Sequence, residues 1–154
     1  MLAAPRDAAL PAGGFWVPPT ILAGLGLTQE QVAMRGHAIE VRILAEDPRR
    51  NFLPSPGRVT DWHFATRPGS VRMDSAMHVG AMVPPYYDSM IGKLIVYGRT
   101  REGCIMRLKR ALEEYVIEGM KTTIPLHQKL LRDPEFQNGD YTIKWLEEWL
   151  DREE

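Results

Sequence analysis

The sequence has a single cysteine, Cys104, so it can form neither an internal disulfide nor a zinc site built from several cysteines. No apolar run approaches the roughly 20 residues that cross a bilayer. Neither sign of charge is in excess, because 19 basic and 20 acidic residues leave a net charge of −1. Without a basic surplus to hold a phosphate backbone, nucleic acid is not an expected partner. The missing apolar run makes a membrane an unexpected partner as well. We expect a cytoplasmic protein.

Motifs for nucleotides, metals and nucleophilic catalysis are also missing. The segment GLGLTQ (24–29) has two of the three glycines of a dinucleotide-binding turn, and no strand precedes it. The sequence contains no Walker-type glycine loop with lysine and no serine in a recognisable nucleophile turn. The histidines lack an i,i+4 pair, so no metal site is expected; they are His37, His63, His78 and His127.

The composition that remains is typical of one globular domain, with 44% hydrophobic and 25% charged residues over 154 positions. Residues 1–20 contain four prolines and two glycines without a sustained period. We expect them to be poorly ordered, with Phe15 and Trp16 as candidate docking points. The folded domain is expected at 21–154.

Strand patterns come first in this domain. In RGHAIEVRIL (35–44) the apolar and charged residues alternate, which predicts a half-buried strand. One face of this strand carries Ile39, Val41 and Ile43, and the other face carries Glu40 and Arg42. Further strands are predicted at 58–64, at 71–79 after an RPGS turn, and at 93–97, which is the most apolar and is closed by Gly98.

Helical periodicity follows. The spacing of apolar residues predicts a helix over 101–118, capped by Thr100 and ended by Gly119, with Cys104 as a small buried hydrophobe. A second helix is predicted at 124–131. A third, at 142–150, is expected to bury Trp145, Leu146, Trp149 and Leu150. Strands followed by helices indicate an α+β domain, an antiparallel β-sheet packed with about three helices.

Glu40 and Arg42 lie side by side on the polar face of the first predicted strand. Residues i and i+2 on a strand are about 6.6 Å apart, so the two side chains can form an exposed ion pair of less than about 1 kcal/mol. Alternatively, Arg42 faces a pocket and holds a developing oxyanion while Glu40 orients its guanidinium. The pattern alone leaves both interpretations open.

The corner VPPYYDS (83–89) stands before the most apolar strand. PPYY (84–87) matches a short proline-rich ligand of aromatic-grooved peptide modules, which must be exposed and extended. Its place between Val83 and a strand favours burial instead.

Four segments resemble the C-terminal domain of biotin carboxylase: RGHAIEVRILAEDP (35–48), NFLPSPGRV (51–59), VPPYYDSMIGKLIVYG (83–98) and EGMKTTIPLHQKLLRD (118–133). They occur in order and with family-like spacing. The resemblance implies a ligase in which ATP activates bicarbonate and N1 of biotin, carried on a protein, is carboxylated in the first half-reaction of acetyl-CoA carboxylase and fatty acid synthesis. Residues 1–20 do not resemble the family.

The resemblance also implies site residues. Arg42 occupies the position of the family arginine that lies against the ureido oxygen of biotin, with Glu40 as its orienter. Val41 replaces the cysteine usual in the family, and this change should affect packing alone because the residue faces the other way. Tyr86, Tyr87 and Asp88 are expected to pack and dock against the rest of the enzyme.

A homodimer is a further expectation of the resemblance. Arg72 matches a basic position in the subunit interface of the family. The loop TRPGS (66–70) departs from the family because it lacks the aromatic residue that often packs there.

Other parts of the enzyme are expected to lie outside this chain. In the family, the residues that bind ATP, Mg²⁺ and bicarbonate belong to upstream domains, so we expect these 154 residues alone to be inactive. Met120-Lys121-Thr122 is not a biotin-attachment motif, which implies that biotin arrives on a separate carrier protein. The alternative is a non-catalytic assembly module that keeps the fold.

Overall fold

A computed structural model describes residues 17–33, 35–64 and 66–153. The chain divides after Gly36 into two compact units. In the first unit, α1 (Pro19–Leu25) is followed by the 3-10 turn η1 (Gln29–Gln31). Helix α1 begins at Pro19, two residues before the expected start of the domain at Ile21. Phe15 and Trp16, the expected docking points, lie outside the described residues.

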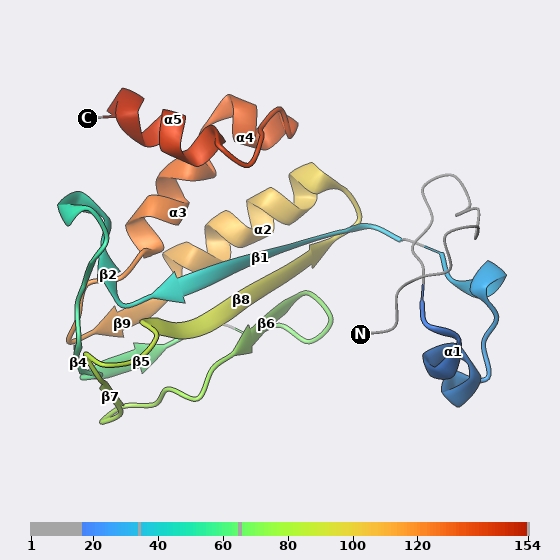
Figure 1. The fold of residues 1–154 in the computed structure, drawn as a ribbon, viewed down its shortest axis with the longest axis horizontal. Helices are drawn as coiled ribbons and strands as arrows, with labels where there is room; N and C mark the ends of the chain where they lie inside the picture. Colours follow the sequence, from blue (N-terminus) through green and yellow to red (C-terminus); the bar gives the residue numbers. More distant parts are fainter. Residues whose placement is uncertain (1–16, 34, 65, 154) are drawn as a thin grey trace. The chain divides into compact units, whose positions relative to one another are not determined.

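The second unit is built on a three-stranded antiparallel sheet of order β1-β8-β6 (Figure 1). Its strands are β1 (His37–Leu44), β8 (Met90–Gly98) and β6 (Val71–Asp74). The predicted first strand and the alternation of its faces are confirmed. The predicted strand at 93–97 is longer in the structure, and the one at 71–79 ends already at Asp74.

The other strands among the described residues form short antiparallel pairs. They are β2 (Glu46–Asp47) with β3 (Leu53–Pro54), β4 (Gly57–Arg58) with β7 (Met82–Val83), and β5 (Asp61–His63) with β9 (Val116–Glu118). A 3-10 turn, η2 (Pro48–Arg50), lies between β2 and β3. The prediction of one strand over 58–64 was wrong because β4 and β5 pair with different partners. Buried Val59 lies between them and exchanges main-chain hydrogen bonds with Gly80 and Ala81.

In the described part of this unit the α-helices are α2 (Arg101–Glu113), α3 (Ile124–Leu130), α4 (Pro134–Asn138) and α5 (Trp145–Glu153). The cap is confirmed, since the Gly103 amide donates to the Thr100 hydroxyl over 3.1 Å. The predicted helix over 101–118 was too long, because Val116–Glu118 form β9 against β5. Gly119 therefore follows a strand and ends no helix.

The second predicted helix agrees with α3 to within a residue, whereas α4 was not predicted and α5 starts three residues later than 142. The RPGS turn is confirmed, with the Ser70 amide bonded to the Arg67 carbonyl. None of the helices in the described ranges is long and apolar enough to cross a membrane.

The core lies between the sheet and α2, which packs on β8 and β1. The completely buried side chains include Ile43, Leu94, Val96, Cys104 and Leu108. Cys104 is thus the small buried hydrophobe that the sequence predicted. Ile43 on β1 and Leu94 and Val96 on β8 alternate with side chains that point to the other face of the sheet, which is the face that carries Glu40 and Arg42.

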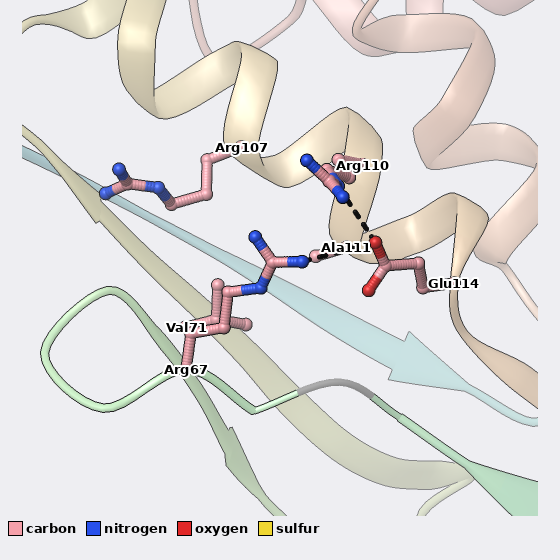
Figure 2. Close-up of a pocket in the computed structure, with 6 residues that line it drawn as sticks. All are labelled: Arg67, Val71, Arg107, Arg110, Ala111 and Glu114. Atoms are coloured by element: carbon pink, nitrogen blue, oxygen red, sulfur yellow. Dashed lines mark hydrogen bonds and ion pairs between the residues drawn. The ribbon is translucent and has the colours of Figure 1, made fainter.

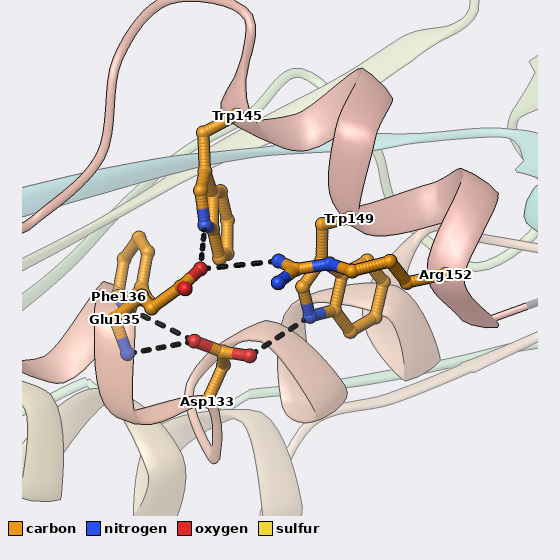
Figure 3. A network of polar contacts seen from close by, with 6 residues as sticks. All are labelled: Asp133, Glu135, Phe136, Trp145, Trp149 and Arg152. Atoms are coloured by element: carbon orange, nitrogen blue, oxygen red, sulfur yellow. Dashed lines mark hydrogen bonds and ion pairs between the residues drawn. The ribbon is translucent and has the colours of Figure 1, made fainter.

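A second apolar cluster joins α3 to α5 and contains Leu126, Leu130, Trp145 and Trp149. Figure 3 shows how two carboxylates hold the tryptophans. The Trp149 indole donates to Asp133 over 3.0 Å, and the Trp145 indole donates to Glu135 over 2.6 Å. The predicted burial of both tryptophans is confirmed. That of Leu146 was wrong, since it is 37% exposed, and Leu150 is half-buried.

Candidate functional site

Arg42 projects from the face of β1 opposite the core, as the alternation predicted. Its Nε atom lies 4.0 Å from Oε1 of Glu40, at the outer limit of an ion pair, and the two side chains are 67% and 43% exposed. An exposed pair at this distance contributes little to stability. Glu40 is therefore close enough to bias the guanidinium but does not lock it.

The main chain of Arg42, in contrast, is held firmly by the start of α3. Its carbonyl oxygen accepts hydrogen bonds from the Thr123 hydroxyl at 3.3 Å and from Nε2 of His127 at 2.9 Å. The Thr123 oxygen also accepts from the Leu44 amide at 3.1 Å, and Thr123 is only 2% exposed. A buried, doubly bonded threonine fixes where the Arg42 side chain leaves the strand.

The neutral form of His127, which can donate one hydrogen bond to the Arg42 carbonyl, is favoured in the folded protein. Burial lowers its pKa, while the hydrogen bond to the Arg42 carbonyl acts in the opposite direction and is the smaller effect. Sequence reasoning missed Thr123 and His127 because they lie 81 and 85 residues from Arg42. The only available signal was TTIPLH, a threonine followed by a helix start.

Three cations share the exposed face of the sheet. Lys93 lies directly opposite Arg42 on the neighbouring strand, and Asp74 lies opposite Lys93 on the next. Arg72 donates to both carboxylate oxygens of Asp74, at 2.6 and 2.7 Å. The hydrogen bonds from Arg72 lower the pKa of Asp74, so its carboxylate stays charged. Arg72, the expected interface residue, is thus ordered by a bidentate pair and remains 74% exposed at its side chain.

The PPYYDS corner leads into β8. The Asp88 carboxylate accepts from the Met90 amide at 2.8 Å and so starts the strand. Tyr86 and Tyr87 are 87% and 81% exposed, so the expectation that this corner buries its tyrosines was wrong for this chain. The buried positions of β8 begin only at Ile91, after the corner.

A cavity of about 270 Å³ lies beside this corner. It is lined by Ala45, Glu46, Pro54, Pro56, Val83, Pro84, Pro85, Tyr87, Asp88 and Ser89. Arg42 is not among these residues, since the nearest lining position on its segment is Ala45, about 10 Å further along the chain. Arg42 on β1 and the corner before β8 therefore do not line one common pocket, although Ala45 and Glu46, which follow β1, line the cavity beside the corner. Among the described residues, no three histidine, cysteine, aspartate or glutamate side chains are grouped for a metal.

Comparison with known proteins identifies the family. Residues 40–148 match the family described as Biotin carboxylase C-terminal domain. This chain belongs to that family. The matched range begins at Glu40 and contains Arg42, Arg72, the PPYYDS corner and the His127 anchor.

Individual biotin carboxylases are similar to this domain in sequence and in structure. Biotin carboxylase 1 of Bacillus subtilis is 53% identical over 125 residues, which cover 80% of this chain and 27% of the relative. The crystal structure of the biotin carboxylase subunit of pyruvate carboxylase superposes with a TM-score of 0.78 at 41% identity, covering 83% of this chain and 28% of that one.

A third relative carries ligands. The biotin carboxylase domain of Hydrogenobacter thermophilus 2-oxoglutarate carboxylase, a dimer in complex with MgADP, ADP and bicarbonate, superposes with a TM-score of 0.76 at 40% identity. The superposition covers 79% of this chain and 26% of the H. thermophilus domain. The chain thus spans about a quarter of the length of these three relatives, and it has the α+β fold of a biotin carboxylase C-terminal domain.

Proposed function

We propose that this domain supplies the guanidinium of Arg42 to the carboxylation of biotin. Removing the proton from N1 of biotin places negative charge on the ureido oxygen. An arginine stays protonated throughout and donates to that oxyanion in a preset geometry. The observation that carries the proposal is the contrast at Arg42, whose main chain is fixed by Thr123 and His127 while its guanidinium remains open to a ligand. Glu40 biases the guanidinium from 4.0 Å.

The remaining chemistry is assigned to polypeptide outside these residues. The H. thermophilus relative binds MgADP and bicarbonate, and this chain matches about a quarter of its length. We infer that ATP, Mg²⁺ and bicarbonate bind mainly to the other part of the enzyme and that carrier-bound biotin approaches Arg42 from the solvent side of the sheet. The 154 residues alone should neither hydrolyse ATP nor carboxylate biotin.

The PPYYDS corner is proposed to dock that other part. Two tyrosines more than four-fifths exposed on a proline-stiffened loop are an unusual surface for an isolated domain. Asp88 and Glu46 add carboxylates beside the adjacent cavity. Arg72, with Asp74, is proposed as part of a subunit interface, which is supported by the dimeric state of the H. thermophilus relative.

The test is a pair of substitutions in an intact biotin carboxylase that contains this domain. Arg42→Met should slow biotin carboxylation by about 100-fold or more, the usual cost of losing one oxyanion donor. ATP cleavage in the absence of biotin should fall much less. Arg49→Met, at another exposed arginine, is the control. Equal loss of both activities, with a lower melting temperature, would show a folding defect and remove the assignment.

A second candidate function is a non-catalytic assembly module. The exposure of Tyr86 and Tyr87 favours it, because a docking surface needs no chemistry at Arg42. This alternative predicts that Tyr86→Ala weakens association with the ATP-binding part of a carboxylase, while Arg42→Met leaves both association and turnover unchanged.

A further inference from the structure

Three arginines surround a small recess on the side of the domain formed by α2 and the turn before β6. The recess has a volume of about 20 Å³, enough for one water-sized group. It is lined by Arg67, Val71, Arg107, Arg110, Ala111 and Glu114 (Figure 2). Arg67 belongs to the loop TRPGS (66–70), which lacks the aromatic residue expected from the family.

The guanidinium of Arg67 is carried by a rigid turn. The amide of Val71 donates to the Arg67 carbonyl at 2.9 Å, and the Arg67 amide donates to the Val71 carbonyl at 3.1 Å. Gly69 has the positive φ of +75° that such a tight reversal requires. The base of the Arg67 side chain is therefore preorganised against α2.

Glu114 holds two of the arginines in place. Its Oε1 atom accepts from Nε of Arg110 at 2.9 Å, one helical turn away, and from the Arg67 guanidinium at 3.5 Å. Arg107 donates to the main-chain carbonyl of Tyr97, which places it at the other side of Arg67. The hydrogen bond from Arg110 is the main reason why the pKa of Glu114 is lowered, so this carboxylate is ionised.

Charge is not balanced at this site. Three guanidiniums meet one carboxylate, and His63, the other titratable group that acts on Glu114, adds no negative charge. In contacts with the described residues, each guanidinium uses one of its nitrogens, although it offers five N–H donors. A surplus of two positive charges and several open donors remains around the recess.

We propose that this recess binds a tetrahedral oxyanion of the phosphate class, either free orthophosphate or the terminal group of a phosphate monoester. A phosphate dianion would neutralise the two positive charges that remain after Glu114 is counted. A monoanionic carboxylate ligand would neutralise only one of them. One oxygen enters the recess, and the others accept from Arg67 and Arg107, whose planar forks suit phosphate oxygens. Glu114 orients Arg110 and at the same time weakens anion binding.

The experiment titrates the purified 154-residue chain with orthophosphate at constant ionic strength, using chloride to balance salt. Binding is followed by NMR of the arginine Nε–H groups and the backbone amides of Arg67 and residues 69–71. Arg67→Gln and Arg107→Gln should each raise the dissociation constant about fivefold or more. Arg49→Gln, on η2, should not change it.

The informative variant is Glu114→Gln, which removes the competing charge and should tighten phosphate binding severalfold. A purely structural ion-pair cluster predicts no such gain. Phenyl phosphate in a parallel titration separates the two sources: tighter binding than orthophosphate indicates an ester, and weaker binding indicates the free ion. Shifts that follow ionic strength alone, or an unchanged dissociation constant in Arg67→Gln and Glu114→Gln chains with native-like spectra, would overturn the proposal.

Discussion

The Nε2 atom of His127 donates a hydrogen bond to the main-chain carbonyl of Arg42 over 2.9 Å, across 85 residues of sequence. Together with the Thr123 hydroxyl it ties the edge strand β1 to the first turn of α3. The main chain of Arg42 is therefore held by residues that lie 81 and 85 positions later in the sequence. The charge at this position, in contrast, comes from the Arg42 side chain itself.

The first prediction concerns acidification. Burial lowers the pKa of folded His127, whereas the unfolded chain has the ordinary value near 6.5. Below this value the unfolded state binds more protons, so the contribution of neutral His127 is complete above about pH 6.5 and is lost as the pH falls further. His127→Asn should reduce the loss of unfolding free energy between about pH 7.5 and 5.5 by up to about 1 kcal/mol. Urea denaturation at both values measures it, and His78→Asn, at an exposed histidine, should leave the loss unchanged.

The second prediction concerns Thr123. Thr123→Val keeps the shape but removes the acceptor of the Leu44 amide and the donor to the Arg42 carbonyl. Leaving the Leu44 amide without this acceptor, and the Arg42 carbonyl with His127 as its remaining side-chain donor, should cost about 1–3 kcal/mol of unfolding free energy, measured by urea denaturation. Thr123→Ser retains the hydroxyl and should recover most of that loss. Equal stability of the valine and serine variants would contradict the anchoring role.

The third prediction concerns Gly119, which follows β9 and lies directly against the backbone of Arg58 in β4. Its φ is +100°, and a Cβ atom there would lie 2.0 Å from the carbonyl oxygen of Arg58. Gly69 also has a positive φ, of +75°, but faces open space. Gly69→Ala should cost about 1–2 kcal/mol from backbone strain. Gly119→Ala should cost at least about 2 kcal/mol more, because β4 and β9 must separate. Thermal unfolding of the two variants gives the comparison, and similar melting temperatures would refute it.

The fourth prediction concerns the attachment of α5. Trp149→Phe removes the indole donor to Asp133, the residue that also caps α4 through the amides of Glu135 and Phe136. A lost hydrogen bond to a carboxylate should cost about 1–2 kcal/mol at this half-buried site. Leu146→Ala, on the exposed side of the same helix, should stay within about 0.5 kcal/mol of the parent. Chemical denaturation followed by tryptophan fluorescence measures both, and a larger loss in Leu146→Ala would show that α5 packs differently.

Local patterns in the sequence determined several features of this domain. The alternation in HAIEVRIL placed Glu40 and Arg42 on the outer face of β1, and Thr100 marked the start of α2. Four ordered segments were enough to identify the biotin carboxylase C-terminal domain. The strand alternation and the helix cap depend on neighbours within a few residues, so the local sequence encodes them directly.

Tertiary structure alone decided the remaining features. The predicted helix ends early because Val116–Glu118 find a strand partner in β5, more than fifty residues earlier. The anchoring of Arg42 by His127 and the meeting of Arg67 with Glu114 likewise join distant segments. Periodicity records which face of an element is apolar, but not which remote segment will cover it. Such contacts form only when the chain closes on itself, and for that reason they could not be predicted from the sequence.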